Sequence, residues 1–238
     1  MPRTPRPKLV GDKDRLIPAE LRVQVLAHAE ARYRKHRLAP GGEPRSSAAR
    51  NAGSLYFALQ LADLAGLRIS EVVKLQMRDC DVSRKPYRLM IRASKHRTAA
   101  HVDEQPIGEE LAALLRPWVT VPGWGDRHVA GWRRRPYSRQ WILHLCKEAH
   151  QACGVPSIYN FHSWRHGYGT RIYQATKDLV FTSRMLRHRS VKPTERYVHM
   201  SQSDDELDNV LAAIAQRPAR AAKSTKSPQR QAARRVRR

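Results

Sequence analysis

The apolar positions of this 238-residue chain recur mostly every three or four residues, which is the spacing of amphipathic helices. Residues 55–65 are almost wholly apolar and are followed by Gly66, a residue that often ends a helix, so they predict a buried helix. Another helix is predicted from Ser203, where the sequence SDDE forms a capping box. The first predicted helix begins at residues 17–20. Further helices are predicted over 55–65, 70–75, 108–118, 133–152, 163–176, 178–187 and 203–216.

Two of these helices carry more detailed predictions. Pro117 predicts the end of the helix that starts at residue 108, because proline in a helix interior removes a hydrogen bond and clashes with the preceding turn. Trp141, Leu145 and Ala149 share one face of the helix at 133–152, which predicts that this face packs on the core.

A small sheet is predicted between the helices. Residues 87–92 alternate between apolar and polar side chains, as a β-strand does. Residues 102–107 predict the return strand, with Pro106 either on an edge strand or at a strand end because it cannot donate to a strand ladder. The polar segment 94–101 would form the hairpin tip. The chain is therefore predicted to be mainly α with a small antiparallel β-sheet, an α+β fold.

Charge adds a partner to this picture. The chain has 45 Lys and Arg against 21 Asp and Glu, a net charge of +24, which favours an anionic polymer such as nucleic acid. The hydrophobic share of 41% excludes a wholly disordered chain. There is no run of 18 apolar residues, no signal-peptide pattern and no CxxC pair, so we expect a cytoplasmic, nucleoid-associated protein with reduced thiols and no membrane partner.

The charge is not distributed evenly along the chain. Residues 217–238 hold nine Lys or Arg and no acid, which predicts a disordered tail. This tail is either a solubilising end or a phosphate clamp that makes DNA affinity salt-dependent. Residues 1–14 are predicted to be a flexible basic arm, 15–202 one compact domain, and 203–216 a separate C-terminal helix.

Several familiar chemistries are missing from the sequence. It contains no GxxxxGK[ST] loop, no GxGxxG turn and no GxSxG elbow. Asp79 and Asp81 could suggest a metal pair, but two acids separated by one residue after a helix are more often part of a turn. We therefore expect no cofactor and no metal.

Three segments instead gather basic side chains around one tyrosine. They read GLRISEVVKLQMRDCDV, FHSWRHGYGTRI and MLRHRSVKPTERYVHM. Each alone has an ordinary interpretation: an arginine in a surface ion pair, a histidine and an arginine on one helix face, a tyrosine in a core. In this order and spacing, however, the chain resembles the tyrosine recombinases, also called phage integrases, across residues 15–216.

The resemblance implies the fold of a tyrosine recombinase catalytic domain and a DNA strand-exchange reaction without metal or ATP. A tyrosine attacks a phosphodiester, forms a 3′-phosphotyrosine link and releases a 5′-hydroxyl, which splits one difficult step into two. The site residues that the resemblance implies are the catalytic Arg68, Lys95, His162, Arg165, His188 and Tyr197, with Glu71 and His166 in support.

The arginines suit charge on non-bridging oxygens, because a guanidinium offers forked donors. Lys95 would protonate the leaving 5′-oxygen as a general acid, and His162, joined by His166, would either accept the tyrosine proton or hold a phosphate oxygen. His188 would donate to a non-bridging oxygen. We also expect four further arginines to contact DNA: Arg97, Arg187, Arg234 and Arg235.

The sequence departs from the family pattern in two places. Arg187 stands where the family usually has glycine, which predicts either a different loop path or a new phosphate contact. Only 67 residues precede Arg68, so we expect a catalytic domain without a separate core-binding domain. The helix at 203–216 would dock either on its own core or on a neighbouring subunit.

Docking on a neighbour predicts a homo-tetramer on double-stranded DNA. An accessory DNA-bending protein or a second recombinase would be a further partner. Two other functions stay open: a recombinase-like module that binds DNA without cutting it, and a monomeric type IB topoisomerase. The sequence does not distinguish integration from excision, inversion or resolution.

Overall fold

The computed structural model describes residues 16–36, 40–44, 46–92, 102–131, 134–188, 190–195 and 197. The chain divides into two compact units, residues 1–201 and 202–238, and every described residue belongs to the first. The predicted basic arm, hairpin tip, C-terminal helix and basic tail lie outside the described residues.

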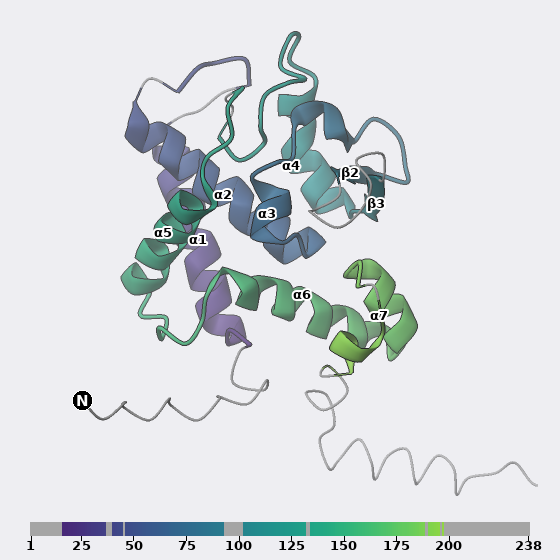
Figure 1. Cartoon of the computed structure of the whole chain (residues 1–238). Helices are drawn as coiled ribbons and strands as arrows, with labels where there is room; N and C mark the ends of the chain where they lie inside the picture. The colour runs from purple at the N-terminus through teal and green to yellow at the C-terminus, as the bar shows by residue number, and fades with distance from the viewer. Residues whose placement is uncertain are drawn as a thin grey trace, which may run out of the picture. The chain divides into compact units, whose positions relative to one another are not determined.

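The described part is mainly helical, with one small antiparallel sheet, so the predicted fold class is confirmed (Figure 1). Within it, no helix is both long enough and apolar enough to cross a bilayer. The helices are α1 (Ala19–Lys35), α2 (Ser47–Ala65), α3 (Ile69–Val72), α4 (Glu109–Val119), α5 (Arg139–Ala152), α6 (Phe161–Thr176) and α7 (Leu179–Met185), with the 3₁₀ turns η2 (Met77–Asp79) and η3 (Lys192–Thr194).

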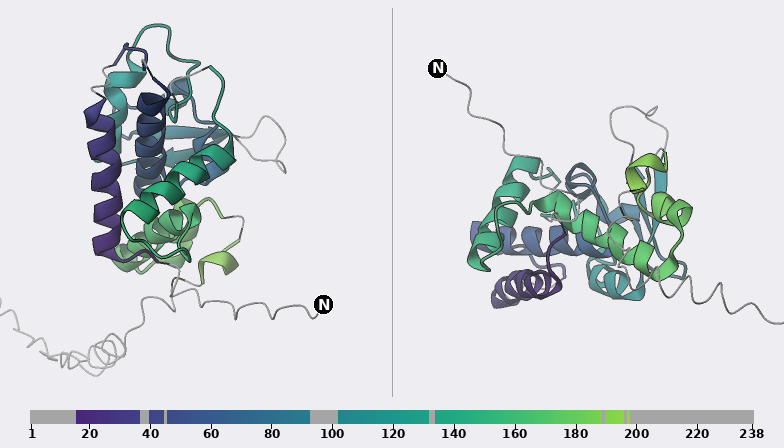
Figure 2. Two further views of the ribbon diagram at one scale, coloured as in Figure 1. Left: turned by 90° about the vertical axis from the view of Figure 1, so that its left-hand side faces the viewer. Right: turned by 90° about the horizontal axis from the view of Figure 1, so that it is seen from below.

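Helix α2 is the centre of the core. It packs against α1, α5 and α6, and α1 runs alongside it (Figure 2). The helix starts earlier than its apolar run predicts, because the Ser46 hydroxyl accepts a hydrogen bond from the Ala49 amide at 3.1 Å and caps it. It ends as predicted at Gly66, whose φ of 61° is the left-handed conformation that glycine adopts without strain. The chain therefore turns sharply into the loop that leads to α3.

The sheet has three antiparallel strands in the order β1 (Cys80–Asp81), β2 (Arg88–Arg92) and β3 (Val102–Pro106). The strand pair β2–β3 confirms the predicted hairpin, with Leu89 opposite Gln105 and Pro106 at the end of the edge strand. Strand β1 was not predicted, because two residues are too short to show an alternating pattern.

The predicted helix at 108–118 is confirmed to within one residue at each end, but Pro117 is not where it ends. Helix α4 continues through Pro117 to Val119. Leu115 and Trp118 are both buried on either side of the proline, so packing against the core holds this last turn in helical form.

The prediction for the helix at 133–152 is wrong at its start and in part on its face. Helix α5 begins only at residue 139, because the Ser138 hydroxyl caps it by accepting from the Trp141 amide at 3.1 Å. Leu145 and Ala149 are buried, but Trp141 is 39% exposed. Its indole N–H donates to the Asn51 side-chain oxygen at 3.1 Å, so the ring lies at the rim of the core and not inside it.

Candidate active site

Arg68 is fixed at the start of α3 by Glu71. The Arg68 amide donates to Glu71 Oε2 at 2.8 Å, and Arg68 Nη1 donates to Glu71 Oε1 at 2.8 Å. The Arg68 side chain is 37% exposed, whereas that of Glu71 is 8% exposed. A buried carboxylate therefore orients a guanidinium group that still reaches solvent.

Arg165 lies in the first turns of α6 and is buried. Its guanidinium donates to the Gly66 carbonyl at the end of α2 and to the Leu186 carbonyl after α7. Nη1 is 4.0 Å from Glu71 Oε2. Burial, together with the positive charges of Arg68 and Arg187, lowers the pKa of Arg165 to about 9, so it stays protonated at neutral pH. The Arg165 guanidinium therefore links α6 to the end of α2 and to the segment after α7.

Arg187 completes this cluster. It donates from Nη2 to Glu71 Oε2 at 2.7 Å, and its side chain is 5% exposed. Burial alone would raise the pKa of Glu71, but the charges of Arg187, Arg165 and Arg68 and the Arg68 amide hold it below its ordinary value. Glu71 is therefore ionised, and three guanidinium groups surround one carboxylate.

Tyr197 lies beside two histidines of α6. Its hydroxyl is 3.4 Å from His166 Nδ1, a hydrogen-bonding contact whose donor depends on the histidine tautomer. The His166 ring meets the His162 ring edge to face, with centroids 4.6 Å apart. His166 is buried and His162 is exposed, so the two rings lead from the tyrosine hydroxyl to the surface.

Tyr197 itself is enclosed in a small apolar cluster with Tyr168 and Leu186, and is 2% exposed. Gly169 on α6 makes room for the ring: a Cβ atom at that position would lie 2.7 Å from Tyr197 Cζ and 2.9 Å from a Leu186 methyl carbon. The close approach of ring and helix therefore depends on a residue without a side chain.

His188 is held on the segment after α7. Its Nδ1 is 2.8 Å from the Thr194 hydroxyl, and its amide donates to the Ser183 carbonyl at 3.0 Å. Thr194 is fully buried. The imidazole is therefore oriented by a buried hydroxyl group on the segment that leads to Tyr197.

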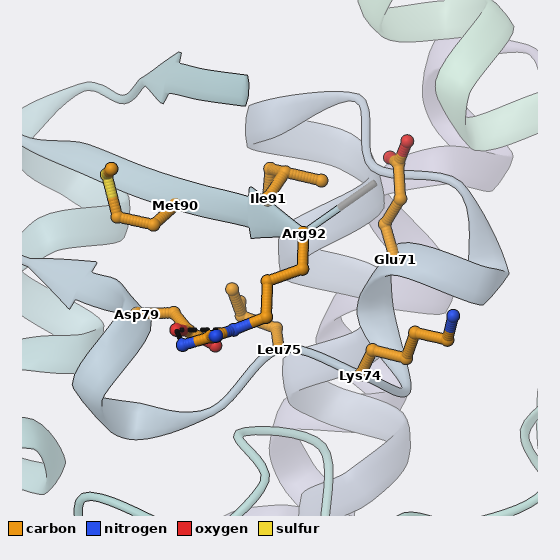
Figure 3. Close-up of a pocket in the computed structure, with 7 residues that line it drawn as sticks. All are labelled: Glu71, Lys74, Leu75, Asp79, Met90, Ile91 and Arg92. Carbon is orange, nitrogen blue, oxygen red and sulfur yellow. Dashed lines mark hydrogen bonds and ion pairs between the residues drawn. The ribbon is translucent and has the colours of Figure 1, made fainter. Parts of the chain in front are cut away.

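A small pocket lies between α3 and the end of β2 (Figure 3). Glu71 and Lys74 line it on the helix side, and an ion pair between Asp79 and Arg92 closes the other side. Arg92 donates to Asp79 Oδ1 from Nη2 at 2.6 Å and from Nε at 3.2 Å. The pair fixes the end of β2, where the chain leaves toward the predicted hairpin tip.

The structure brings together most of the predicted site residues that it describes. Arg68, Glu71, Arg165 and Arg187 form one charge cluster, and His162, His166 and Tyr197 form a contact chain next to it. His162 and Arg165 were expected to lie on the same face of a helix. They differ in their surroundings, because His162 is exposed and Arg165 is buried. The predicted Lys95, Arg97, Arg234 and Arg235 lie outside the described residues.

Sequence reasoning missed several contributors. The carbonyls of Gly66 and Leu186 are backbone groups, which no residue pattern reveals. Gly169 could have been noticed as the second glycine of the helical sequence GYG. Thr194 gives no signal, since its hydroxyl meets His188 only through the turn between them.

Metal ligation has no support in the described residues. No group of three or more His, Cys, Asp or Glu side chains gathers there in a way that could hold an ion. Asp79, one of the two acids weighed as a metal pair, is buried and engaged by Arg92 and by the Gln76 amide. The acid is thus part of the turn before β1.

Known proteins resemble this chain in sequence. The sequence matches the Phage integrase family over residues 44–204, more than half of the chain. The chain belongs to the phage integrase family. Tyrosine recombinase XerC of Haemophilus ducreyi is 26% identical over 146 residues, which are 60% of this chain and 46% of that relative. The chain therefore spans about half the length of this curated relative.

Solved structures of phage integrase relatives share the fold. The post-cleavage complex of XerH bound to palindromic difH substrate superposes with a TM-score of 0.61 at 14% identity, covering 84% of this chain and 53% of that one. The catalytic domain of bacteriophage HP1 integrase superposes with a TM-score of 0.52 at 15% identity, covering 86% of this chain and 98% of that domain. The fold is that of a tyrosine recombinase catalytic domain.

Proposed function

We propose that this protein is a site-specific DNA recombinase that cuts and rejoins double-stranded DNA through a 3′-phosphotyrosine intermediate. The observation that carries the proposal is the position of the Tyr197 hydroxyl, 3.4 Å from His166 on the helix whose Arg165 joins the arginine cluster around Glu71. A nucleophile beside a base and a concentration of guanidinium groups are what phosphoryl transfer requires.

In the first step, the Tyr197 oxygen bonds to phosphorus and the bond from phosphorus to the 5′-oxygen breaks. The phenolic proton passes to His166, from which the His162 ring leads toward solvent. Lys95, by resemblance, protonates the departing 5′-oxygen. Rejoining is the reverse reaction with another 5′-hydroxyl. Because the phosphoester is exchanged and not hydrolysed, the cycle needs no ATP.

Charge on the phosphate is stabilised by Arg68 and, once the site has opened, by Arg165, whose guanidinium is buried in this structure. Arg68 is oriented by Glu71 and remains partly exposed, so it can meet a phosphate oxygen without rearranging. His188, fixed by Thr194, donates to another non-bridging oxygen. The arginines supply the charge stabilisation that a metal ion provides in other nucleases, so cleavage proceeds in the presence of a chelator.

The burial of Tyr197 adds a requirement. A side chain that is 2% exposed cannot reach a DNA phosphate until its apolar cluster opens. DNA binding must therefore be coupled to a rearrangement of the segment between α7 and Tyr197. The same burial favours a second candidate function, a module that binds DNA without cutting it, and a covalent adduct distinguishes the two.

Partners and assembly follow from charge and resemblance. The net charge of +24 favours double-stranded DNA and a location at the nucleoid. A homo-tetramer on two duplexes, with the helix at 203–216 docked on a neighbour, is the assembly we propose. An accessory DNA-bending protein or a second recombinase as a further partner stays a prediction. Native mass spectrometry of the protein–DNA complex measures how many copies are bound, and so distinguishes a tetramer from a monomeric topoisomerase-like enzyme.

The decisive variants are Tyr197→Phe and Tyr168→Phe. Both remove one hydroxyl from the same apolar cluster, but only Tyr197 is the proposed nucleophile. We expect Tyr197→Phe to bind DNA and form no covalent adduct, whereas Tyr168→Phe still forms it. Denaturing electrophoresis of end-labelled DNA measures the adduct, and an adduct with Tyr197→Phe would show that another residue attacks.

A further inference from the structure

The Arg187 guanidinium is enclosed but only partly satisfied. Its side chain is 5% exposed, and one nitrogen, Nη2, donates to Glu71 Oε2 at 2.7 Å. The other two nitrogens, Nε and Nη1, are buried and have no hydrogen-bond partner within the described part of the chain. Buried donors of a charged group are costly to leave unpaired, so their presence points to an acceptor that binds there.

The backbone at Arg187 gives a second indication. Its φ is 51°, in the left-handed region where an ordinary side chain is strained and glycine is not. The preceding carbonyl, that of Leu186, receives the Arg165 guanidinium, and the Arg187 amide donates to the Arg184 carbonyl at 2.9 Å. The turn after α7 thus positions two guanidinium groups at once, and an arginine occupies a strained position to do so.

The balance of charge around Glu71 gives a third indication that an anion binds next to Arg187. Arg68 and Arg187 bond to opposite oxygens of Glu71, and Arg165 is 4.0 Å from Oε2. Three positive charges therefore face one negative charge, which leaves a surplus of two. The mutual repulsion is visible at Arg165, whose pKa is lowered by burial and then by the charges of Arg68 and Arg187. An anion bound there, such as a phosphodiester with its single negative charge, would reduce this surplus.

We propose that Arg187 is a third phosphate-binding arginine, which keeps Nη2 on Glu71 and donates from Nε, on the same edge of the guanidinium, to a phosphate held jointly with Arg68. The phosphate-binding site stands on the geometry of the charge cluster alone. Its identification with the scissile phosphate of DNA rests on the proposed function. Arg187 would then strengthen transition-state binding and act as a catalytic residue.

The first test observes the Arg187 Nε–H directly by nitrogen-15 NMR. This resonance is assigned by its absence in Arg187→Lys. We expect it to shift and saturate with inorganic phosphate, in wild type and in Tyr197→Phe alike, but not with chloride at the same ionic strength. An unmoved resonance, or the same shift with chloride, would overturn the phosphate site whatever the tyrosine does.

The second test measures single-turnover cleavage at the DNA site recovered from covalent adducts. Arg187→Gln should slow cleavage by about 10²-fold, the typical loss of one oxyanion donor, and Arg187→Lys by less. The matched control is Arg184→Gln, an exposed arginine one turn away, which should cleave at the wild-type rate. Arg187→Gly keeps the backbone conformation without strain, so a loss there cannot be assigned to backbone strain.

A DNA substrate with a neutral methylphosphonate at the scissile position tests whether Arg187 contacts the phosphate directly or acts only by positioning Glu71. If Arg187 donates to that phosphate, the penalty of Arg187→Gln shrinks when the charge it meets has been removed. An equal penalty on both substrates would show that Arg187 acts only through Glu71. Absence of any wild-type adduct would count against the recombinase proposal, and the phosphate titration would still decide whether Arg187 binds phosphate.

Discussion

Glu71 organises the charges of the candidate active site. Its two oxygens accept hydrogen bonds from the Arg68 side chain, the Arg68 amide and the Arg187 side chain, and Arg165 lies next to them. Removing this one carboxylate would leave three guanidinium groups facing each other in a partly dry site, which is a costly arrangement.

A pH dependence follows from the lowered pKa of Glu71. A carboxyl whose pKa is lower in the folded protein stabilises the fold above its unfolded pKa, near 4.5, and loses that contribution as the pH falls through the folded value. We expect Glu71→Gln to lower Tm at neutral pH, and the difference from wild type to shrink below pH 4.5. Scanning calorimetry across this range measures it, with the exposed Glu110→Gln as the control.

A difference between wild type and Glu71→Gln that stays constant down to the lowest pH would contradict this account. It would mean that Glu71 stabilises the fold through the packing of its side chain and not through its charge. The Glu110→Gln control should follow wild type throughout, because Glu110 is an exposed residue of α4.

Gly169 gives a second prediction at this scale. The Cβ of Gly169→Ala would lie 2.7 Å from Tyr197 Cζ, so the tyrosine ring has to move. Because Tyr197 must leave this cluster before it reaches a DNA phosphate, destabilising its packing should raise the rate of adduct formation, with DNA binding kept. Gly167→Ala is the matched control, since its Cβ comes closest to the end of the flexible Arg171 side chain, at 3.2 Å. Equal rates of adduct formation in both variants would contradict the packing role.

At the residue scale, the sequence motifs located the site but not its contacts. Arg68, Glu71 and Arg165 were predicted by resemblance, and the structure places them together. The bond from Arg187 to Glu71 could not be predicted, because it depends on a left-handed turn at a residue that avoids this conformation. The burial of Tyr197 was equally invisible, since its enclosure comes from side chains on α6 and after α7.

At the scale of elements, the pairing of η2 with β2 sets where the hairpin tip begins. Asp79 is 2% exposed, caps η2 through the Gln76 amide and binds Arg92 at the end of β2. We expect Asp79→Ala to lower the free energy of unfolding by roughly 2 kcal/mol, the combined size of a missing cap and a missing charged hydrogen bond. Urea denaturation measures this decrease.

The matched control for that prediction is Asp81→Ala. Asp81 is the same residue type two positions away in β1, but its side chain is exposed and accepts a hydrogen bond from the Ser83 hydroxyl at 3.1 Å. Its substitution should change stability by less than about 0.5 kcal/mol. A similar decrease in both variants would show that Asp79 has no special anchoring role.

Elements with a strong local pattern were predictable, and those set by packing were not. The long apolar run of α2 and the alternating residues of β2 gave the correct element types. Helix α4 passes through Pro117 because residues on both sides of it are buried, which a local rule cannot anticipate. Strand β1 exists only because two residues pair with β2.

At the scale of the whole molecule, the surplus of basic residues governs how DNA is held. Residues 217–238 contribute nine of the 45 Lys and Arg. We expect their removal to reduce the slope of log affinity against log salt by about 0.9 for each DNA phosphate that the tail neutralises, with the preferred DNA site unchanged. Fluorescence anisotropy at several salt concentrations measures the slope. A tail with its Lys and Arg replaced by Gln should behave like the deletion, and an unchanged slope would contradict the clamp.

The central claim is that Tyr197 becomes covalently joined to DNA, and one measurement addresses it directly. The protein is expressed in cells that carry its native DNA, lysed in denaturant with a chelator, and the residue left on the DNA is identified by peptide mass spectrometry. We predict a 3′-phosphate on Tyr197, with the attached DNA sharing one sequence. A linkage on another residue, or no linkage while DNA binding is intact, would contradict the account.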